Sequence, residues 1–109
     1  HYKGKTIAGV LDLDVSEALG FFEPGEGIGA ARRGETTADG DLPVNLSGGL
    51  KAKGHPVGAT GASQVVEMAK LLDGTHHNAE KVPEATVGVT HNAGGTVAST
   101  AVHVLEVVE

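Results

Sequence analysis

The clearest pattern of hydrophobic and polar positions lies in residues 60–72. The apolar positions recur every three or four residues and the polar ones fall between them (apolar Val65, Met68, Ala69 and Leu72; polar Gln64, Glu67 and Lys70). This spacing predicts an amphipathic helix over Thr60–Leu72 whose polar side chains face away from the core. Gly74 follows directly and predicts the end of that helix.

Two runs rich in Val and Thr, residues 85–90 and 98–108, surround the sequence Asn92-Ala93-Gly94-Gly95. This order predicts two adjacent antiparallel strands joined by a turn at residues 92–95. Residues 101–105 are apolar at nearly every position, which predicts a central strand covered on both faces. Because so few strands and helices cannot cover both faces, the pattern also predicts a partner chain.

The N-terminal part is less regular. Residues 6–13 predict a strand or the start of a helix, and Asp14 or Ser16 could cap a short helix that ends at Gly20. Residues 23–43 contain Pro24, several glycines and a polar run, and we expect a loop excursion there. Residues 75–84 predict a polar connection.

Composition narrows the class of protein. The 109 residues allow one small domain, and with 3% aromatic residues its core must come from Val, Leu, Ile and Ala, which favours α/β layers. The net charge of −6 and the scattered basic residues argue against a nucleic-acid partner. The absence of cysteine excludes a disulfide scaffold, a thiolate metal site and a cysteine nucleophile within this chain.

No apolar run approaches the length of a membrane span, and the N-terminus lacks the order of charged and apolar residues typical of a signal peptide. We therefore expect a cytoplasmic protein with no membrane partner. Asn45-Leu46-Ser47 matches a glycosylation sequon, which we do not expect to be used.

Residues 44–61 are dense in glycine and include one histidine, His55, between Gly54 and Pro56. Such glycine density marks backbone that turns sharply or approaches a ligand closely. The proline restricts the backbone beside the imidazole, which can titrate near neutral pH. The segment therefore predicts an active-site loop directly before the predicted helix.

Other candidate sites are weaker. His76-His77 could join other histidines at a metal, but neighbouring strand residues point to opposite faces, and a solvated loop pair is the preferred interpretation. His103 is expected to be a hydrogen-bonded sheet residue. Residues 25–29 have the wrong spacing for a dinucleotide loop, and Arg32-Arg33 is left outside the site as an exposed pair.

Several separated motifs resemble the thiolases, the enzymes that make or cleave 3-oxoacyl-CoA. Residues 45–61 resemble their glycine-rich Gly-His-Pro loop, and residues 90–95, followed by an apolar strand, resemble their closing segment. Residues 19–27 and 40–45 are similar to the archaeal and sterol-carrier-linked branch. The resemblance extends over residues 17–109, whereas residues 1–16 match poorly.

The resemblance implies an α/β fold that is incomplete on its own. A thiolase is several times longer and has two similar halves in a layered αβαβα core. This chain resembles the last part of the C-terminal half, so residues 1–109 would form a partial thiolase-like C-terminal domain. The nucleophilic cysteine of the family belongs to the other half.

The resemblance also assigns roles to residues. His55 would hydrogen-bond the thioester oxygen as negative charge develops there, and the Gly94 N–H would be a second donor. Ser47, Gly48 and Gly49 would lie close to the pantetheine arm of CoA. These assignments come from the matching motif positions.

Acid/base chemistry is where the chain departs from the family. Asn92 stands at the position of the acid/base cysteine, and an amide cannot carry a proton at neutral pH. His91 could serve as a base, although a hydrogen-bonded turn histidine is the preferred interpretation. The cysteine motif of the sterol-carrier-linked branch is expected near residues 1–5 and does not occur there.

Three interpretations remain open. The chain is the C-terminal portion of an acyltransferase that condenses acetyl-CoA to acetoacetyl-CoA or reverses that reaction, and another polypeptide supplies the cysteine. Alternatively, it is a non-catalytic binding or assembly subunit, or a fragment of a full-length thiolase. The implied partners are an acyl-CoA substrate and an N-terminal thiolase polypeptide or a second copy of the chain. No metal or redox cofactor is implied.

Overall fold

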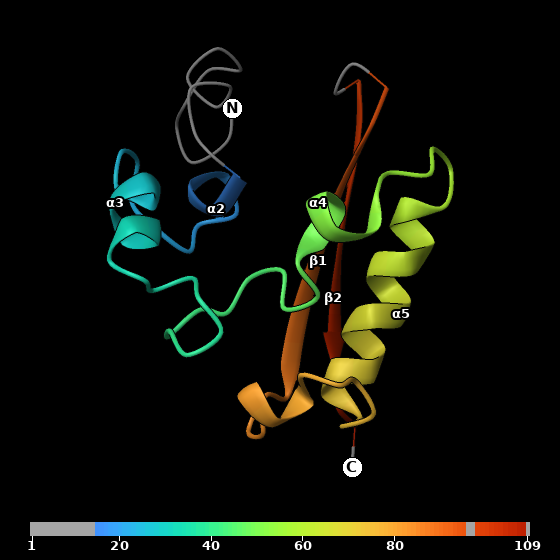
Figure 1. Ribbon diagram of the computed structural model, residues 1–109. Coiled ribbons are helices and arrows are strands. Elements are labelled where there is room, and N and C mark those ends of the chain that lie inside the picture. The colour runs from blue at the N-terminus through green and yellow to red at the C-terminus, as the bar shows by residue number, and fades with distance from the viewer. Residues whose placement is uncertain (1–14, 96–97, 109) are drawn as a thin grey trace. The chain divides into compact units, whose positions relative to one another are not determined.

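A computed structural model describes residues 15–95 and 98–108 (Figure 1). The chain divides into two compact units, residues 1–44 and residues 45–109. Each unit has its own internal contacts and is described by itself.

The described part of the first unit begins with helix α2, Val15–Ala18. It ends before Gly20, whose φ of 85° places it in the left-handed region, so the short helix predicted there is confirmed. Ser16 lies within the helix and therefore does not cap it. Asp14 and the element predicted for residues 6–13 lie outside the described residues.

The next helix, α3 (Gly27–Arg32), lies inside the segment predicted to be a loop. The carboxylate of Glu17 accepts a hydrogen bond of 2.8 Å from the Gly27 N–H, which satisfies one donor of the first helical turn. Ala30 is fully buried. The prediction of a loop is therefore wrong for Gly27–Arg32, whereas the rest of residues 23–43 forms turns and irregular backbone.

The described residues of the second unit form three helical segments and two strands: α4 (Gly49–Lys53), α5 (Thr60–Leu72), the 3₁₀ turn η1 (Ala79–Lys81), β1 (Val87–Gly94) and β2 (Ser99–Glu106). The bounds of α5 are those predicted from its pattern. Gly74 follows with a φ of 80°, which confirms the predicted end of the helix.

Strands β1 and β2 pair antiparallel, as predicted, from Val87 opposite Glu106 to Gly94 opposite Ser99. The turn predicted at residues 92–95 is misplaced. Residues 92–94 belong to β1, and Gly95 is the one residue of the predicted turn that lies beyond the strand. The cross-strand pairs Asn92–Ala101 and Ala93–Thr100 extend the hairpin beyond the expected end of the first strand.

Helix α5 packs along one face of this hairpin (Figure 1). A Cβ atom on Gly88 would lie 2.1 Å from the Met68 sulfur, so a glycine is needed for the close approach of helix and strand. Gln64 was expected to face away from the core. Instead its amide donates a 3.0 Å hydrogen bond to the His91 carbonyl, because a long polar side chain can satisfy a strand carbonyl across the interface.

The prediction of a covered central strand is wrong for β2 within this chain. The sheet of the described residues has two strands, and nearly every residue of β2 is exposed, including Val104 at 68%. The described part has three buried apolar residues (Ala30, Leu71 and Ala79). Among the residues described, no helix has the length and apolarity required to cross a membrane.

Candidate active site

His55 lies in the short connection between α4 and α5. Gly54 ends α4 with a φ of 82°, and Gly58 has a φ of 85°, conformations that residues with a side chain adopt only at a cost. Pro56 fixes the backbone directly after the histidine. The local sequence therefore turns the chain sharply and restricts the backbone on both sides of the imidazole.

The Thr60 hydroxyl orients the ring. Its oxygen lies 2.7 Å from His55 Nδ1 and 3.3 Å from the Pro56 carbonyl oxygen. That carbonyl already accepts the N–H groups of Ala59 and Thr60, at 3.0 and 3.2 Å, which occupy both of its lone pairs. The hydroxyl can donate its single proton to either acceptor, and we assign that proton to Nδ1 because this contact is the shorter and the carbonyl already has two N–H donors. With this assignment the neutral ring carries its own proton on Nε2.

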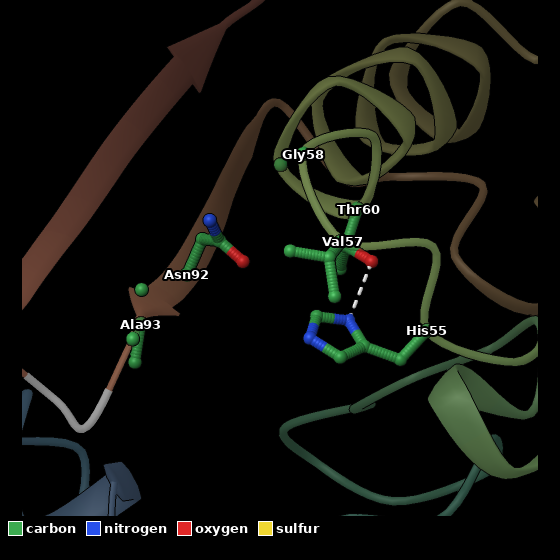
Figure 2. A pocket seen from close by; sticks show the side chains of 9 residues that line it. His55, Val57, Gly58, Thr60, Asn92 and Ala93 are labelled. Carbon is green, nitrogen blue, oxygen red and sulfur yellow. Dashed lines mark hydrogen bonds between the residues drawn. The ribbon is translucent and has the colours of Figure 1, made fainter.

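The second ring nitrogen faces the side on which Asn92 and Ala93 lie (Figure 2). Between them is a cavity of about 360 Å³, within the range of small-molecule sites. Its lining joins the His55 loop, the start of α5 and the end of β1 (His55, Val57, Gly58, Thr60, Gly61, Asn92, Ala93, Gly94 and Gly95). The structure thus brings His55, Asn92 and Gly94 to one cavity, although they are far apart in sequence.

The first turn of α5 and the end of β1 approach each other closely at Gly61. A Cβ atom there would lie 3.1 Å from the Asn92 side-chain nitrogen, so the glycine leaves room for the amide. Thr60 and Gly61 also place the N-terminal end of α5 at the cavity, where the helix dipole favours negative charge. Neither residue was predicted from the sequence to belong to the site. A hydroxyl at the first position of the helix, five residues after the histidine, was the available signal.

His91 is not part of the cavity lining. Since successive strand side chains point to opposite faces and Asn92 faces α5, the His91 side chain faces away from α5. Its main-chain carbonyl, and not its ring, makes the contact with the helix.

The residues expected near CoA form a tight turn at the start of α4. Gly48 and Gly49 have φ values of 90° and 63°, and a Cβ atom on Gly48 would lie 2.7 Å from that of Ala52. Ser47 Oγ accepts a hydrogen bond of 3.4 Å from the Gly49 N–H. These three residues do not line the cavity beside His55, and their expected contact with CoA stays a prediction.

His76, His77 and His103 lie outside the cavity lining. His103 lies 3.4 Å from the Thr90 hydroxyl across the hairpin, which confirms the predicted sheet role. His76 corrects the expectation of a solvated pair: its side chain is 7% exposed, and its ring stacks on His77. Within residues 15–95 and 98–108, no three His, Asp or Glu side chains are grouped so that they could hold a metal ion.

Comparison with known proteins decides the family. The family described as "Thiolase C-terminal domain-like" matches residues 5–107. The chain belongs to this thiolase family. The resemblance was expected to begin at residue 17, but the family match begins at residue 5.

Relatives include proteins of the two branches expected from the motifs. The chain is 50% identical to acetyl-CoA acetyltransferase of Methanothermobacter thermautotrophicus over 91% of its own length, and 44% identical to sterol carrier protein 2 of Homo sapiens over 76%. It is 34% identical to the benzoylsuccinyl-CoA thiolase subunit BbsB of Thauera aromatica over 79%. The matches span 25%, 15% and 22% of these relatives, so the chain corresponds to a small part of each.

Proposed function

We propose that this thiolase segment forms the C-terminal part of an acyltransferase that condenses acyl-CoA units and cleaves 3-oxoacyl-CoA in the reverse direction. The observation that carries the proposal is the orientation of His55. Thr60 holds Nδ1 at 2.7 Å, which leaves Nε2–H toward a cavity whose far wall is the end of β1. The names of the relatives, which include acetyl-CoA acetyltransferase, support acetyl-CoA as a substrate.

In the proposed reaction, a cysteine thiolate from the remaining thiolase sequence attacks the carbonyl carbon of an acyl-CoA. The carbonyl oxygen gains negative charge and accepts a hydrogen bond from His55 Nε2–H, and CoA leaves as a thiolate when the carbonyl reforms. A second acetyl-CoA then loses a proton from its α-carbon and attacks the acyl-cysteine. A carbon–carbon bond forms, the carbon–sulfur bond breaks, and the cysteine thiolate is regenerated.

The chain supplies charge stabilisation and not proton transfer in this scheme. Asn92 lines the cavity where the family resemblance expects a cysteine, and its amide can donate and accept hydrogen bonds without titrating. The nucleophile and the acid/base group are therefore assigned to the remaining thiolase sequence, on the same or on a second polypeptide. No metal or redox cofactor enters the proposed reaction.

A non-catalytic binding or assembly subunit is the second candidate, and the replacement of the acid/base cysteine by Asn92 favours it. The two functions differ in what His55 does. In a binding subunit the His55→Ala substitution leaves every reaction rate unchanged, because no step uses the ring.

The decisive test is therefore His55→Ala in the complete enzyme, meaning this chain with the remaining thiolase sequence. Loss of condensation and thiolysis, with the native mass of the assembly unchanged, supports the catalytic proposal. Full activity of the variant overturns it. Native mass spectrometry with and without CoA provides the control for assembly.

A further inference from the structure

We propose that Glu67 is a positioning residue that fixes both ends of the segment formed by residues 46–55 to α5. This segment carries Ser47, Gly48 and Gly49 at one end and His55 at the other. The inference rests on the proposed function of His55 and adds to it what holds the histidine loop in place.

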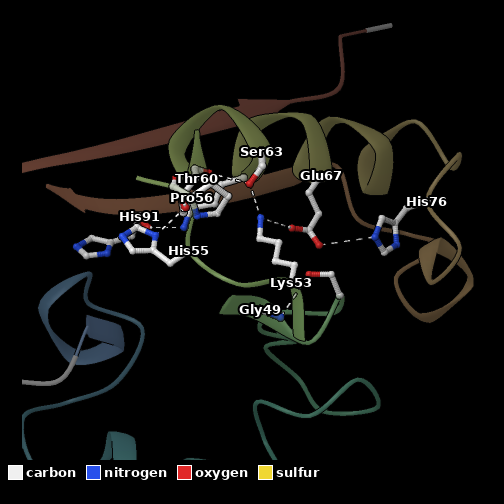
Figure 3. Close-up of polar contacts among 11 residues, drawn as sticks. Gly49, Lys53, His55, Pro56, Thr60, Ser63, Glu67, His76 and His91 are labelled. Atoms are coloured by element: carbon white, nitrogen blue, oxygen red, sulfur yellow. Dashed lines mark hydrogen bonds and ion pairs between the residues drawn. The ribbon is translucent and has the colours of Figure 1, made fainter. Parts of the chain in front are cut away.

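The carboxylate of Glu67 faces two different parts of the chain (Figure 3). Lys53, the last residue of α4, donates through Nζ to the Ser63 hydroxyl and lies 3.9 Å from Glu67 Oε2. Ser63 and Glu67 are one turn apart on α5, so they form a single docking point for the lysine. Lys53 comes two residues before His55, and its position therefore sets the start of the histidine connection.

The other oxygen of the carboxylate, Oε1, lies 3.8 Å from His76 Nε2. His76 Nδ1 accepts a 3.0 Å hydrogen bond from the Asn78 N–H, which leaves the ring proton of the neutral side chain on Nε2, toward Glu67. The Asn78 side chain in turn donates a 2.6 Å hydrogen bond to the Leu46 carbonyl. Glu67 is thereby linked to the residue that directly precedes Ser47.

Apolar packing does not perform this task. Helix α4 has five residues, none of them buried, and Leu50 is 44% exposed. Gly48, Gly49 and Gly54 give the backbone around it more freedom than other residues would. Polar contacts must therefore fix the segment. The Glu67 side chain is only 22% exposed, so solvent screens its interactions with Lys53 and His76 less than it screens ion pairs on the surface.

The two links predict different kinetic effects. Loss of the Lys53 link in Lys53→Met displaces His55 and lowers kcat roughly tenfold, since a misplaced catalytic group costs up to about a hundredfold. Loss of the Leu46 link in Asn78→Ala raises KM for acyl-CoA, because the turn at Ser47 loses its support. Glu67→Gln affects both constants. In kcat, the double variant of Lys53→Met and Glu67→Gln is no slower than Lys53→Met alone, because Lys53→Met already removes the contact with Glu67.

The experiment measures these rates in the complete enzyme together with amide hydrogen exchange over residues 46–55. Glu84→Gln is the matched control, since it removes an exposed carboxylate elsewhere in the same unit. Faster exchange in Glu67→Gln, but not in Glu84→Gln, supports the inference, and exchange equal to that of the parent enzyme overturns it. The exchange result does not depend on activity, so it separates a failure of the positioning role from a failure of the proposed catalytic function.

Discussion

Removal of the Thr60 hydroxyl tests the orientation of His55 most directly. Thr60 is 3% exposed, and valine has almost the same shape, so Thr60→Val removes the hydroxyl without opening a cavity. The substitution deletes the 2.7 Å contact with His55 Nδ1 and leaves the backbone hydrogen bonds to Pro56 in place. His55 is exposed, so water can replace the lost partner on the ring.

The expected losses of stability and activity differ in size. One neutral hydrogen bond contributes about 0.5–1.5 kcal/mol, so we expect a loss of stability near 1 kcal/mol. The ring, however, is then free to turn and to exchange its proton between the two nitrogens. Removal of one oxyanion donor costs roughly 100- to 1,000-fold in kcat, and partial misplacement costs less. We therefore expect kcat to fall about 10- to 100-fold, with little change in KM.

The assay combines initial rates of acetoacetyl-CoA thiolysis with ¹⁵N NMR of the His55 ring in the complete enzyme. The parent protein should show the proton on Nε2, and Thr60→Val should show a mixture of tautomers. Thr60→Ser keeps the hydroxyl and should restore most of kcat. A valine variant with the rate of the parent enzyme, or a serine variant as slow as valine, would refute the assignment of the hydroxyl proton to His55.

Three further predictions concern the cavity, the packing and the end of α5. His55→Gln keeps an N–H donor near the cavity and should retain more activity than His55→Ala, which a comparison of kcat values checks; equal rates would argue against a donor role. Gly88→Ala should destabilise the protein by about 1–3 kcal/mol, because its Cβ would lie 2.1 Å from the Met68 sulfur. Thermal unfolding measures this loss, and a simultaneous Met68→Ala change should recover part of it. The hydrogen bonds from the Thr75 side chain and backbone lower the pKa of Asp73, so their contribution to stability is present above the usual aspartate pKa and is lost as pH falls through the lowered value. NMR titration should find this pKa raised toward its usual value in Thr75→Val; an unchanged pKa would contradict the cause.

The sequence was most informative where one local pattern determined the structure. The spacing of apolar residues determined α5, and the two β-branched runs determined the hairpin. The predictions that were wrong concern residues whose contact partners are distant in the sequence. The first turn of α3 is supported by the Glu17 carboxylate, which accepts the N–H of Gly27 ten residues later in the sequence. Gln64 donates to the His91 carbonyl on β1, and the spacing of residues along a helix contains no information about such a contact.

The apolar pattern of β2 was misleading for a different reason. Its residues are apolar on both faces, but within residues 15–95 and 98–108 the sheet has no third strand, and Val102 and Val104 are exposed. The hydrophobic pattern of a strand reflects its burial in the complete fold. This chain spans 25% of the acetyl-CoA acetyltransferase that it matches, so the pattern of β2 corresponds to a larger fold than the one described. For the candidate site, the motif indicated His55, whereas the contact between Thr60 and the ring was found only in the structure.

The amide at position 92 determines how this wall of the cavity responds to oxidants and alkylating reagents. A thiolate in a cavity wall is open to oxidation and to covalent labelling, whereas a carboxamide is inert to both. Because the whole chain contains no sulfhydryl group, a thiol-specific reagent finds no cysteine to modify in this segment. This segment thus gives the protein a lining that peroxide and electrophiles leave chemically intact at Asn92.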